Sequence, residues 1–102
     1  MIHVLATIEV VDGSIDAFLD EFTRLAPIVR DEAGCIEYGP AVDLTTEISG
    51  VLPARANVVT VIEKWEDEAA LTAHLKAPHM GQFREKVQFM VASVAIQVLQ
   101  PK

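Results

Sequence analysis

This sequence has no run of basic residues and no long run of apolar residues. Its 102 residues include eight Lys and Arg, thinly spread, against fifteen Asp and Glu, for a net charge of −7. Nucleic acids and anionic membranes attract proteins through clustered basic residues. No apolar run approaches the roughly 20 residues that a membrane-spanning helix needs. We therefore expect no nucleic-acid partner and no insertion into a membrane.

Cysteine is almost absent as well. Cys35 is the only one, so a disulfide within the chain is impossible. Residues 1–7 carry neither the basic segment nor the apolar stretch of a secretion signal. Together these features predict a cytoplasmic, reducing environment.

The common cofactor motifs are also lacking. The chain contains no G-x-G-x-x-G, no G-x-x-x-x-G-K-[ST], no H-E-x-x-H and no C-x-x-C. Its serines do not stand in a nucleophile elbow. We therefore expect no nucleotide, flavin or metal cofactor.

Hydrophobic residues, in contrast, are abundant. They make up 51% of the chain, and the mean hydropathy is +0.31. A single domain of this size buries only about 60–65% of the surface that its unfolded chain would expose. Because a soluble monomer rarely leaves a large apolar patch in water, we expect a homodimer.

The spacing of apolar residues predicts the elements. Period-2 alternation or β-branched runs indicate strands, and apolar residues at i, i+3, i+4 and i+7 indicate helices. The predicted strands cover residues 2–11, 35–44, 57–65 and 93–100. The predicted helices cover residues 15–29 and 68–77, with a further helix that starts at Pro78. A loop over residues 45–56 is long enough to suggest a function.

Local signals set the expected boundaries. Ser14 and Asp67 are suited to cap the two main helices. Pro27 falls inside the first helix and predicts a kink or a restart. Gly39 and Pro40 predict a break or a bulge in the second strand.

The element order is β-α-β-β-α-β. This is the ferredoxin-like arrangement of the α+β class, in which a four-stranded antiparallel sheet carries its helices on one face. Both faces of the predicted strands are largely apolar, so we expect the uncovered face to pack against a second copy.

Two stretches of the chain carry a family resemblance. Residues 63–80 read EKWEDEAALTAHLKAPHM, and residues 32–38 read EAGCIEY. They resemble the motifs E-x-W-x-D/S-x-x-A-L-x-x-H-x-x-x-P-H and E-x-G-C-x-x-Y of the antibiotic biosynthesis monooxygenase (ABM) superfamily. The likeness runs along the whole chain and is best to the bacterial quinol monooxygenases.

The resemblance implies a single ABM domain over residues 1–102 that forms a dimeric α+β barrel. It also implies a pocket between the helices and the sheet. There a quinol or another electron-rich aromatic would be oxidised by O₂ without metal or flavin. Such chemistry is reasonable because a quinolate anion is itself an electron donor, and the protein need supply only a base and anion stabilisers.

Five residues are candidates for this chemistry. His74 is the predicted catalytic base, since an imidazole titrates near neutrality, and Trp65 is predicted to stack on the substrate ring and donate its indole N–H. Tyr38, Arg84 and His79 are predicted to bind substrate, with Arg84 stabilising an enolate and superoxide. Each also has a structural interpretation without a role in the chemistry. Trp65 and Tyr38 would be aromatic residues of the core or the sheet. His74 would be a buried histidine with satisfied hydrogen bonds, His79 a helix-start residue and Arg84 a surface cation.

Other functions remain open on the sequence. One is an isomerase that moves protons on a small sugar-like phosphate, although the acidic chain offers few cations for a phosphate. Another is haem degradation, which the resemblance disfavours because Arg84 and Thr7 stand where haem-degrading relatives carry a histidine and an asparagine. A third is a non-catalytic dimeric binding or stress domain.

Overall fold

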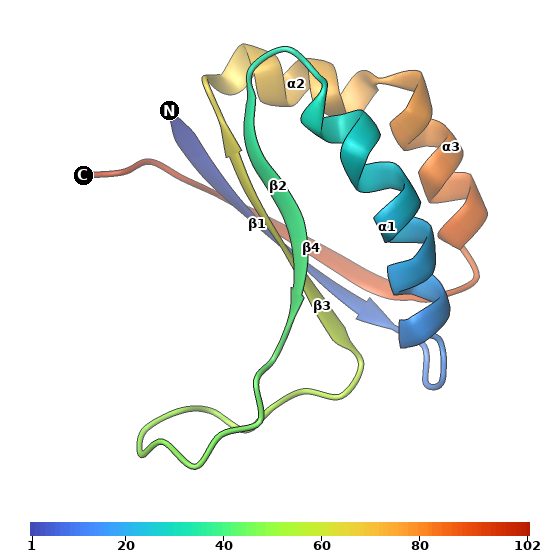
Figure 1. The fold of residues 1–102 in the computed structure, drawn as a ribbon, viewed down its shortest axis with the longest axis vertical. Helices are drawn as coiled ribbons and strands as arrows, with labels where there is room; N and C mark the ends of the chain where they lie inside the picture. The colour runs from blue at the N-terminus through green and yellow to red at the C-terminus, as the bar shows by residue number, and fades with distance from the viewer.

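The computed structural model describes all residues from 1 to 102 and has the expected α+β fold. Four strands form one antiparallel sheet, and three helices cover one of its faces (Figure 1). The strands are β1 (Ile2–Val10), β2 (Cys35–Val42), β3 (Val58–Trp65) and β4 (Val91–Leu99). The helices are α1 (Ile15–Arg30), α2 (Glu68–Lys76) and α3 (Pro78–Val87), and none is long and apolar enough to cross a membrane.

The core lies between the sheet and the helices. The strand order is β2-β3-β1-β4, so β1 and β3 are central and β4 is an edge. Alternate residues of β1 point toward the helices and are buried, as period-2 patterning requires. Helix α1 buries the stripe that its apolar spacing predicts. Its buried residues are Phe18, Phe22, Leu25, Ala26 and Val29.

The helix boundaries confirm some local signals and correct others. Asp67 caps α2, since its Oδ1 accepts a hydrogen bond from the backbone N–H of Ala70 at 2.8 Å. Ser14 stands at the start of α1 but forms no side-chain cap there. Pro27 neither ends nor restarts α1, which runs unbroken to Arg30. The buried side chains on either side of Pro27 hold this turn against the core, and tertiary packing supplies most helix stability.

Strand β2 also differs from expectation. It continues through Gly39 and Pro40, and its irregularity lies between Cys35 and Glu37. Pro40 is tolerated because β2 is an edge strand, where a missing N–H need not interrupt a ladder. The predicted break at Gly39 and Pro40 was therefore wrong.

The face of the sheet away from the helices is less apolar than expected. It mixes hydrophobic residues with polar and charged ones, because the alternate residues of β1 and β3 that do not point to the core include both kinds. These residues are His3, Leu5, Thr7, Glu9, Val58, Thr60, Ile62 and Lys64.

The surplus hydrophobic surface lies elsewhere. Val94, Ile96 and Val98 of β4 are opposite the core residues of β1, yet each is at least half exposed. The loop of residues 43–57, which extends away from the sheet in Figure 1, exposes a second set. These residues are Leu44, Ile48, Val51 and Leu52. Edge strand β4 and this loop therefore expose much of the surplus hydrophobic surface.

The base of this loop is closed by an ion pair. Both carboxylate oxygens of Asp43 accept hydrogen bonds from the Arg55 side chain, at 2.8 and 3.0 Å, and the backbone N–H of Arg55 adds a third at 2.9 Å. The contacts tie residue 43 to residue 55, so the loop between them is held by its two ends.

We predict that this ion pair survives mild acid. The side-chain and then the backbone hydrogen bond from Arg55 lower the pKa of Asp43 from 3.8 to about 2. Because the pKa is lower in the folded chain, the stabilisation is complete above about pH 4 and is lost as the pH falls through about 2. An NMR titration of the Asp43 carboxyl carbon should give a midpoint near 2. A midpoint near 3.8 would contradict the ion pair.

Gly34 occupies a backbone position that no other residue type would fit. Its φ is +83°, and a Cβ added there would lie 2.6 Å from the Cβ of Ala70 in α2. Gly13 has the same φ of +83° but no atom within 4 Å of an added Cβ. Comparing substitutions at the two glycines therefore separates the energetic cost of backbone strain from the cost of the close contact with Ala70.

We predict that Gly34→Ala lowers the free energy of unfolding by about 2–5 kcal/mol, the sum of left-handed backbone strain and overpacking. Gly13→Ala, the matched control, should lower it by only about 1–2 kcal/mol. Urea unfolding of both variants measures the difference. Equal losses would show that the approach to Ala70 is relaxed at little energetic cost.

Candidate functional site

A cavity of about 350 Å³ lies between the sheet and the helices. This is within the range of small-molecule sites. Thirteen of its seventeen lining residues are hydrophobic, and Phe18, Phe22 and Phe83 give it aromatic walls. The side chains that bring polar atoms to it are Tyr38, Glu63, His74, Arg84 and Gln88. The cavity is thus an apolar site of the size of a small aromatic molecule, with a few polar groups at fixed places.

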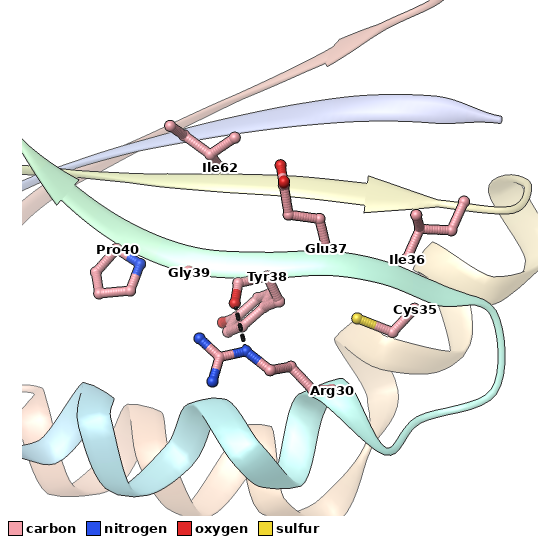
Figure 2. A pocket seen from close by; sticks show the side chains of 8 residues that line it. All are labelled: Arg30, Cys35, Ile36, Glu37, Tyr38, Gly39, Pro40 and Ile62. Carbon is pink, nitrogen blue, oxygen red and sulfur yellow. Dashed lines mark hydrogen bonds between the residues drawn. The ribbon is translucent and has the colours of Figure 1, made fainter.

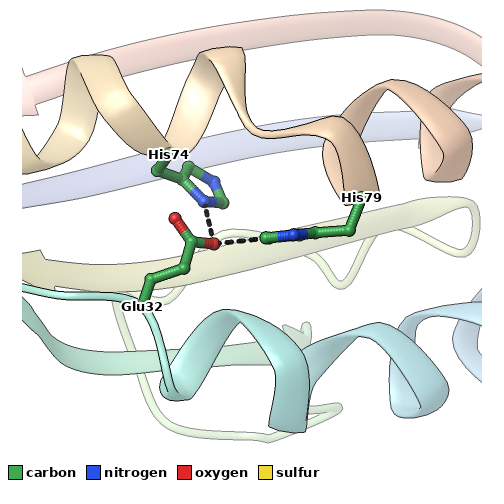
Figure 3. A group of neighbouring side chains, drawn as sticks. All are labelled: Glu32, His74 and His79. Carbon is green, nitrogen blue, oxygen red and sulfur yellow. Dashed lines mark hydrogen bonds and ion pairs between the residues drawn. The ribbon is translucent and has the colours of Figure 1, made fainter.

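His74 is the buried base of this cavity. It lies near the end of α2, is 2% exposed, and stacks beside the ring of Trp65 with centroids 4.7 Å apart. Its Nδ1 is 2.9 Å from Oε2 of Glu32, in the turn after α1 (Figure 3). A carboxylate only accepts hydrogen bonds, so we assign the proton to Nδ1. Nε2 has no partner within the chain and is free to accept a proton from a ligand.

The same Glu32 oxygen is shared with a second histidine. Nε2 of His79, the second residue of α3, lies 2.8 Å from it (Figure 3). His79 does not line the cavity, so the structure does not place it where we expected it to bind substrate. Its contact with Glu32 instead ties the start of α3 to the turn after α1.

Trp65 lies outside the cavity and contacts two residues that line it. It is fully buried, does not line the cavity, and donates its indole N–H to Oε1 of Glu63 at 2.8 Å. The expected hydrogen bond from Trp65 to a substrate is therefore replaced by one within the protein. Trp65 contacts the ring of His74 and the carboxylate of Glu63, and so positions two groups that do line the cavity.

Glu63 is a carboxylate in an apolar wall. It is buried, and its Oε2 has no hydrogen-bond partner in the chain. Burial raises the pKa of Glu63, while the hydrogen bond from Trp65 acts in the opposite direction. Glu63 forms no ion pair with its neighbour Lys64, whose Nζ lies 3.7 Å from Oε2 of Glu37 instead. Glu63 can accept a hydrogen bond or a proton from a ligand.

Tyr38 and Arg84 complete the polar groups. The Tyr38 ring stacks on Phe22 with centroids 5.3 Å apart, and burial raises the pKa of its hydroxyl well above the usual range, so it stays a neutral donor. Arg84 of α3 is exposed at the cavity, where its Nη2 donates to the carbonyl of Leu75 at 3.3 Å. Both line the cavity, and their roles in binding a substrate stay predictions.

A second hollow, of about 510 Å³, lies along edge strand β2 (Figure 2). Arg30 bridges it by donating from Nε to the carbonyl of Tyr38 at 2.9 Å. Cys35 also lines it, but burial and then the charge of Glu32 raise the pKa of its thiol, which makes a nucleophilic thiolate unfavourable. This hollow therefore lacks the histidine and the buried carboxylate that line the first cavity.

Comparison with known proteins identifies the family. The model for the family described as antibiotic biosynthesis monooxygenase matches residues 1–86. This chain belongs to the antibiotic biosynthesis monooxygenase family. One relative of this family member is the protein named probable quinol monooxygenase YgiN of Escherichia coli. The two are 39% identical over 103 residues, which cover 99% of this chain and 98% of YgiN.

Solved structures of similar proteins agree with the ABM fold. A Pseudomonas aeruginosa protein superposes with a TM-score of 0.81 at 27% identity, covering 99% of this chain and 93% of that one. A putative antibiotic biosynthesis monooxygenase from Deinococcus radiodurans gives a TM-score of 0.83 at 18% identity, covering 100% and 93%. At that lower identity the likeness is one of fold alone.

Two site residues were missed from the sequence. Glu32 belongs to one resemblance motif and Glu63 to the other, yet neither was given a role at the site. Position in β3 could have identified Glu63: it alternates with Val61 and Trp65 on the buried face. No comparable signal exists for Glu32, which is brought to His74 only by tertiary packing.

Proposed function

We propose that this ABM protein oxidises a quinol, or a related electron-rich aromatic, with O₂ in the cavity between helices and sheet, without a cofactor. The observation that carries this proposal is His74: its Nδ1 is held by Glu32, its Nε2 has no partner in the chain, and its side chain lines an apolar, aromatic cavity. A base oriented by a carboxylate is the arrangement that proton removal needs. The name of YgiN supports the substrate class.

The reaction balances without an external reductant. His74 takes a proton from one quinol hydroxyl, and the quinolate then passes electrons to O₂. Quinol plus O₂ gives hydroxyquinone plus water: one oxygen atom enters the ring, and the other leaves as water with two hydrogens. All the electrons come from the substrate, which therefore takes the place of a flavin.

The remaining polar groups fit the two oxygens of a quinol. Tyr38 donates a hydrogen bond to the substrate, and Arg84 offsets the negative charge that develops on the quinolate and on superoxide. Glu63 accepts the second hydroxyl proton. The phenylalanine walls hold the ring and exclude water, which strengthens each of these interactions.

A phosphate substrate is a weaker alternative on this geometry. Of the polar groups at the cavity, Arg84 is the one cation, and the carboxylate of Glu63 would repel a phosphate. A phosphate site needs several donors or a helix N-terminus directed at the anion. The cavity suits a neutral aromatic better.

The activity can be tested by O₂ consumption with a panel of naphthohydroquinones, benzohydroquinones and catechols, with flavin and metal contents measured on the same sample. We expect turnover of at least one quinol above its rate of autoxidation, with less than one flavin or metal per ten chains. No turnover of any member of the panel would reject the proposal.

We also propose that the protein is a homodimer joined through β4 and the exposed residues of the 43–57 loop. Val98→Lys, on the apolar side of β4, should shift the protein to monomers at micromolar concentration. Ala17→Lys, on the exposed side of α1, adds the same single positive charge and is the matched control, which should leave the protein dimeric. Sedimentation velocity checks both, and a monomeric wild-type chain would overturn the prediction.

A further inference from the structure

The carboxylate that holds His74 is also the centre of a second group of side chains. Glu32, His74 and His79 come from three places in the sequence: the turn after α1, the end of α2 and the start of α3. Figure 3 shows both imidazole rings directed at one oxygen of Glu32. Nδ1 of His74 lies 2.9 Å and Nε2 of His79 lies 2.8 Å from that oxygen.

These three side chains have the chemistry of a metal site. The two ring nitrogens and a carboxylate oxygen lie within 4.8 Å of one another. Two histidines and one carboxylate are a ligand set that proteins use for Zn²⁺, which binds nitrogen and oxygen at about 2.0–2.2 Å and keeps a position for water. Imidazole also suits Co²⁺ and Cu²⁺, whereas Mg²⁺ and Ca²⁺ prefer oxygen ligands.

The positions of the three residues allow an ion to enter. The side chain of His79 is 25% exposed and that of Glu32 is 14% exposed, while that of His74 is only 2% exposed. An ion can therefore meet His79 and Glu32 first and take His74 as its third ligand. The net charge of −7 favours the approach of cations.

We propose that Glu32, His74 and His79 bind one divalent ion of the zinc class, and that this ion inhibits the enzyme. The inhibition rests on the proposed function of His74. An ion on Nδ1 takes the lone pair of that nitrogen, so the proton of a neutral imidazole must move to Nε2. Nε2, the ring nitrogen that has no partner in the chain, then donates a hydrogen bond and can no longer take a proton from a quinol.

The ion would thus compete with the hydrogen bond that orients the base. Without metal, Glu32 accepts from Nδ1 and leaves Nε2 as a base. With metal, the same carboxylate and the same nitrogen both become ligands. The site couples zinc concentration to quinol oxidation through a single change of histidine tautomer, and it needs no movement of the fold.

Binding is tested first, without reference to activity. Metal-free protein is titrated with Zn²⁺ by calorimetry and with Co²⁺ by visible absorption, and Mg²⁺ serves as an oxygen-preferring comparison. We expect one Zn²⁺ or Co²⁺ per chain and no Mg²⁺. His79→Ala and Glu32→Gln should each weaken Zn²⁺ binding at least about tenfold, as expected for loss of a ligand.

The third histidine of the chain provides a matched control. His3 lies in β1, away from this group, so His3→Ala should bind Zn²⁺ with unchanged affinity and stoichiometry. Absence of stoichiometric Zn²⁺ binding, or an equal loss of affinity in His3→Ala and His79→Ala, would overturn the site.

Inhibition is tested second, with each variant normalised to its own metal-free rate. We expect Zn²⁺ to abolish quinol oxidation by the wild-type chain, and His79→Ala to raise the half-inhibitory concentration at least about tenfold. Activation by Zn²⁺ or Co²⁺ would overturn the inhibitory role. If no quinol is turned over, the proposed function fails while the calorimetric result still decides whether the metal site exists.

Discussion

Replacing His74 with alanine should lower kcat for quinol oxidation at least about a hundredfold and leave the fold intact. A positioned general base typically contributes about 10²–10⁴ to the rate. His74 has the free Nε2, the oriented Nδ1 and the place in the cavity wall that this role requires. The measurements are kcat at saturating substrate and the urea midpoint on the same sample.

A structural role for His74 would give the opposite result. His74 is buried between aromatic rings, and its removal leaves a cavity and leaves Glu32 with His79 as its one remaining partner. If its function were only to fill that space, the variant would lose a few kcal/mol of stability and keep its activity per folded molecule. His79→Ala removes the other imidazole held by Glu32, outside the cavity, and should reduce kcat much less than His74→Ala.

The fold could be predicted because its signals are local. Alternation in β1 and β3, the buried stripe of α1, and the cap at Asp67 each follow from period and residue type within a few positions. Pro27 and Pro40 were misjudged because their effects depend on context. One lies in a helix held by its buried face, and the other lies in a strand at the edge of the sheet.

The site was predicted less completely than the fold. His74, Tyr38 and Arg84 line one cavity, and their roles there stay predictions. The partners of these residues could not be predicted, because the contact between Glu32 and His74 spans 42 positions and depends on how α1 and α2 cover the sheet. Trp65 was expected to touch substrate, but the sequence could not show that Glu63, two positions earlier on the same face, would take its N–H.

Glu63→Gln tests whether Glu63 and His74 each accept one of the two hydroxyl protons of a quinol. Glutamine keeps the size of the side chain and an oxygen that accepts from the Trp65 indole, but it cannot take a proton. Because a quinol has two hydroxyls and His74 serves one, the variant should lose about tenfold to a hundredfold in kcat on a quinol. His74 and the packing around Trp65 should be unaffected, since the hydrogen bond from the indole is retained.

A substrate with one hydroxyl provides the control. The monomethyl ether of the same quinol has a single proton to lose, so its slower oxidation should depend on His74 and change little in Glu63→Gln. Both rates are measured on wild-type and variant protein from the same preparation. Equal losses on the quinol and its ether would mean that Glu63 acts on the charge or shape of the cavity as a whole. Unchanged rates on both would mean that its carboxylate serves Trp65 alone.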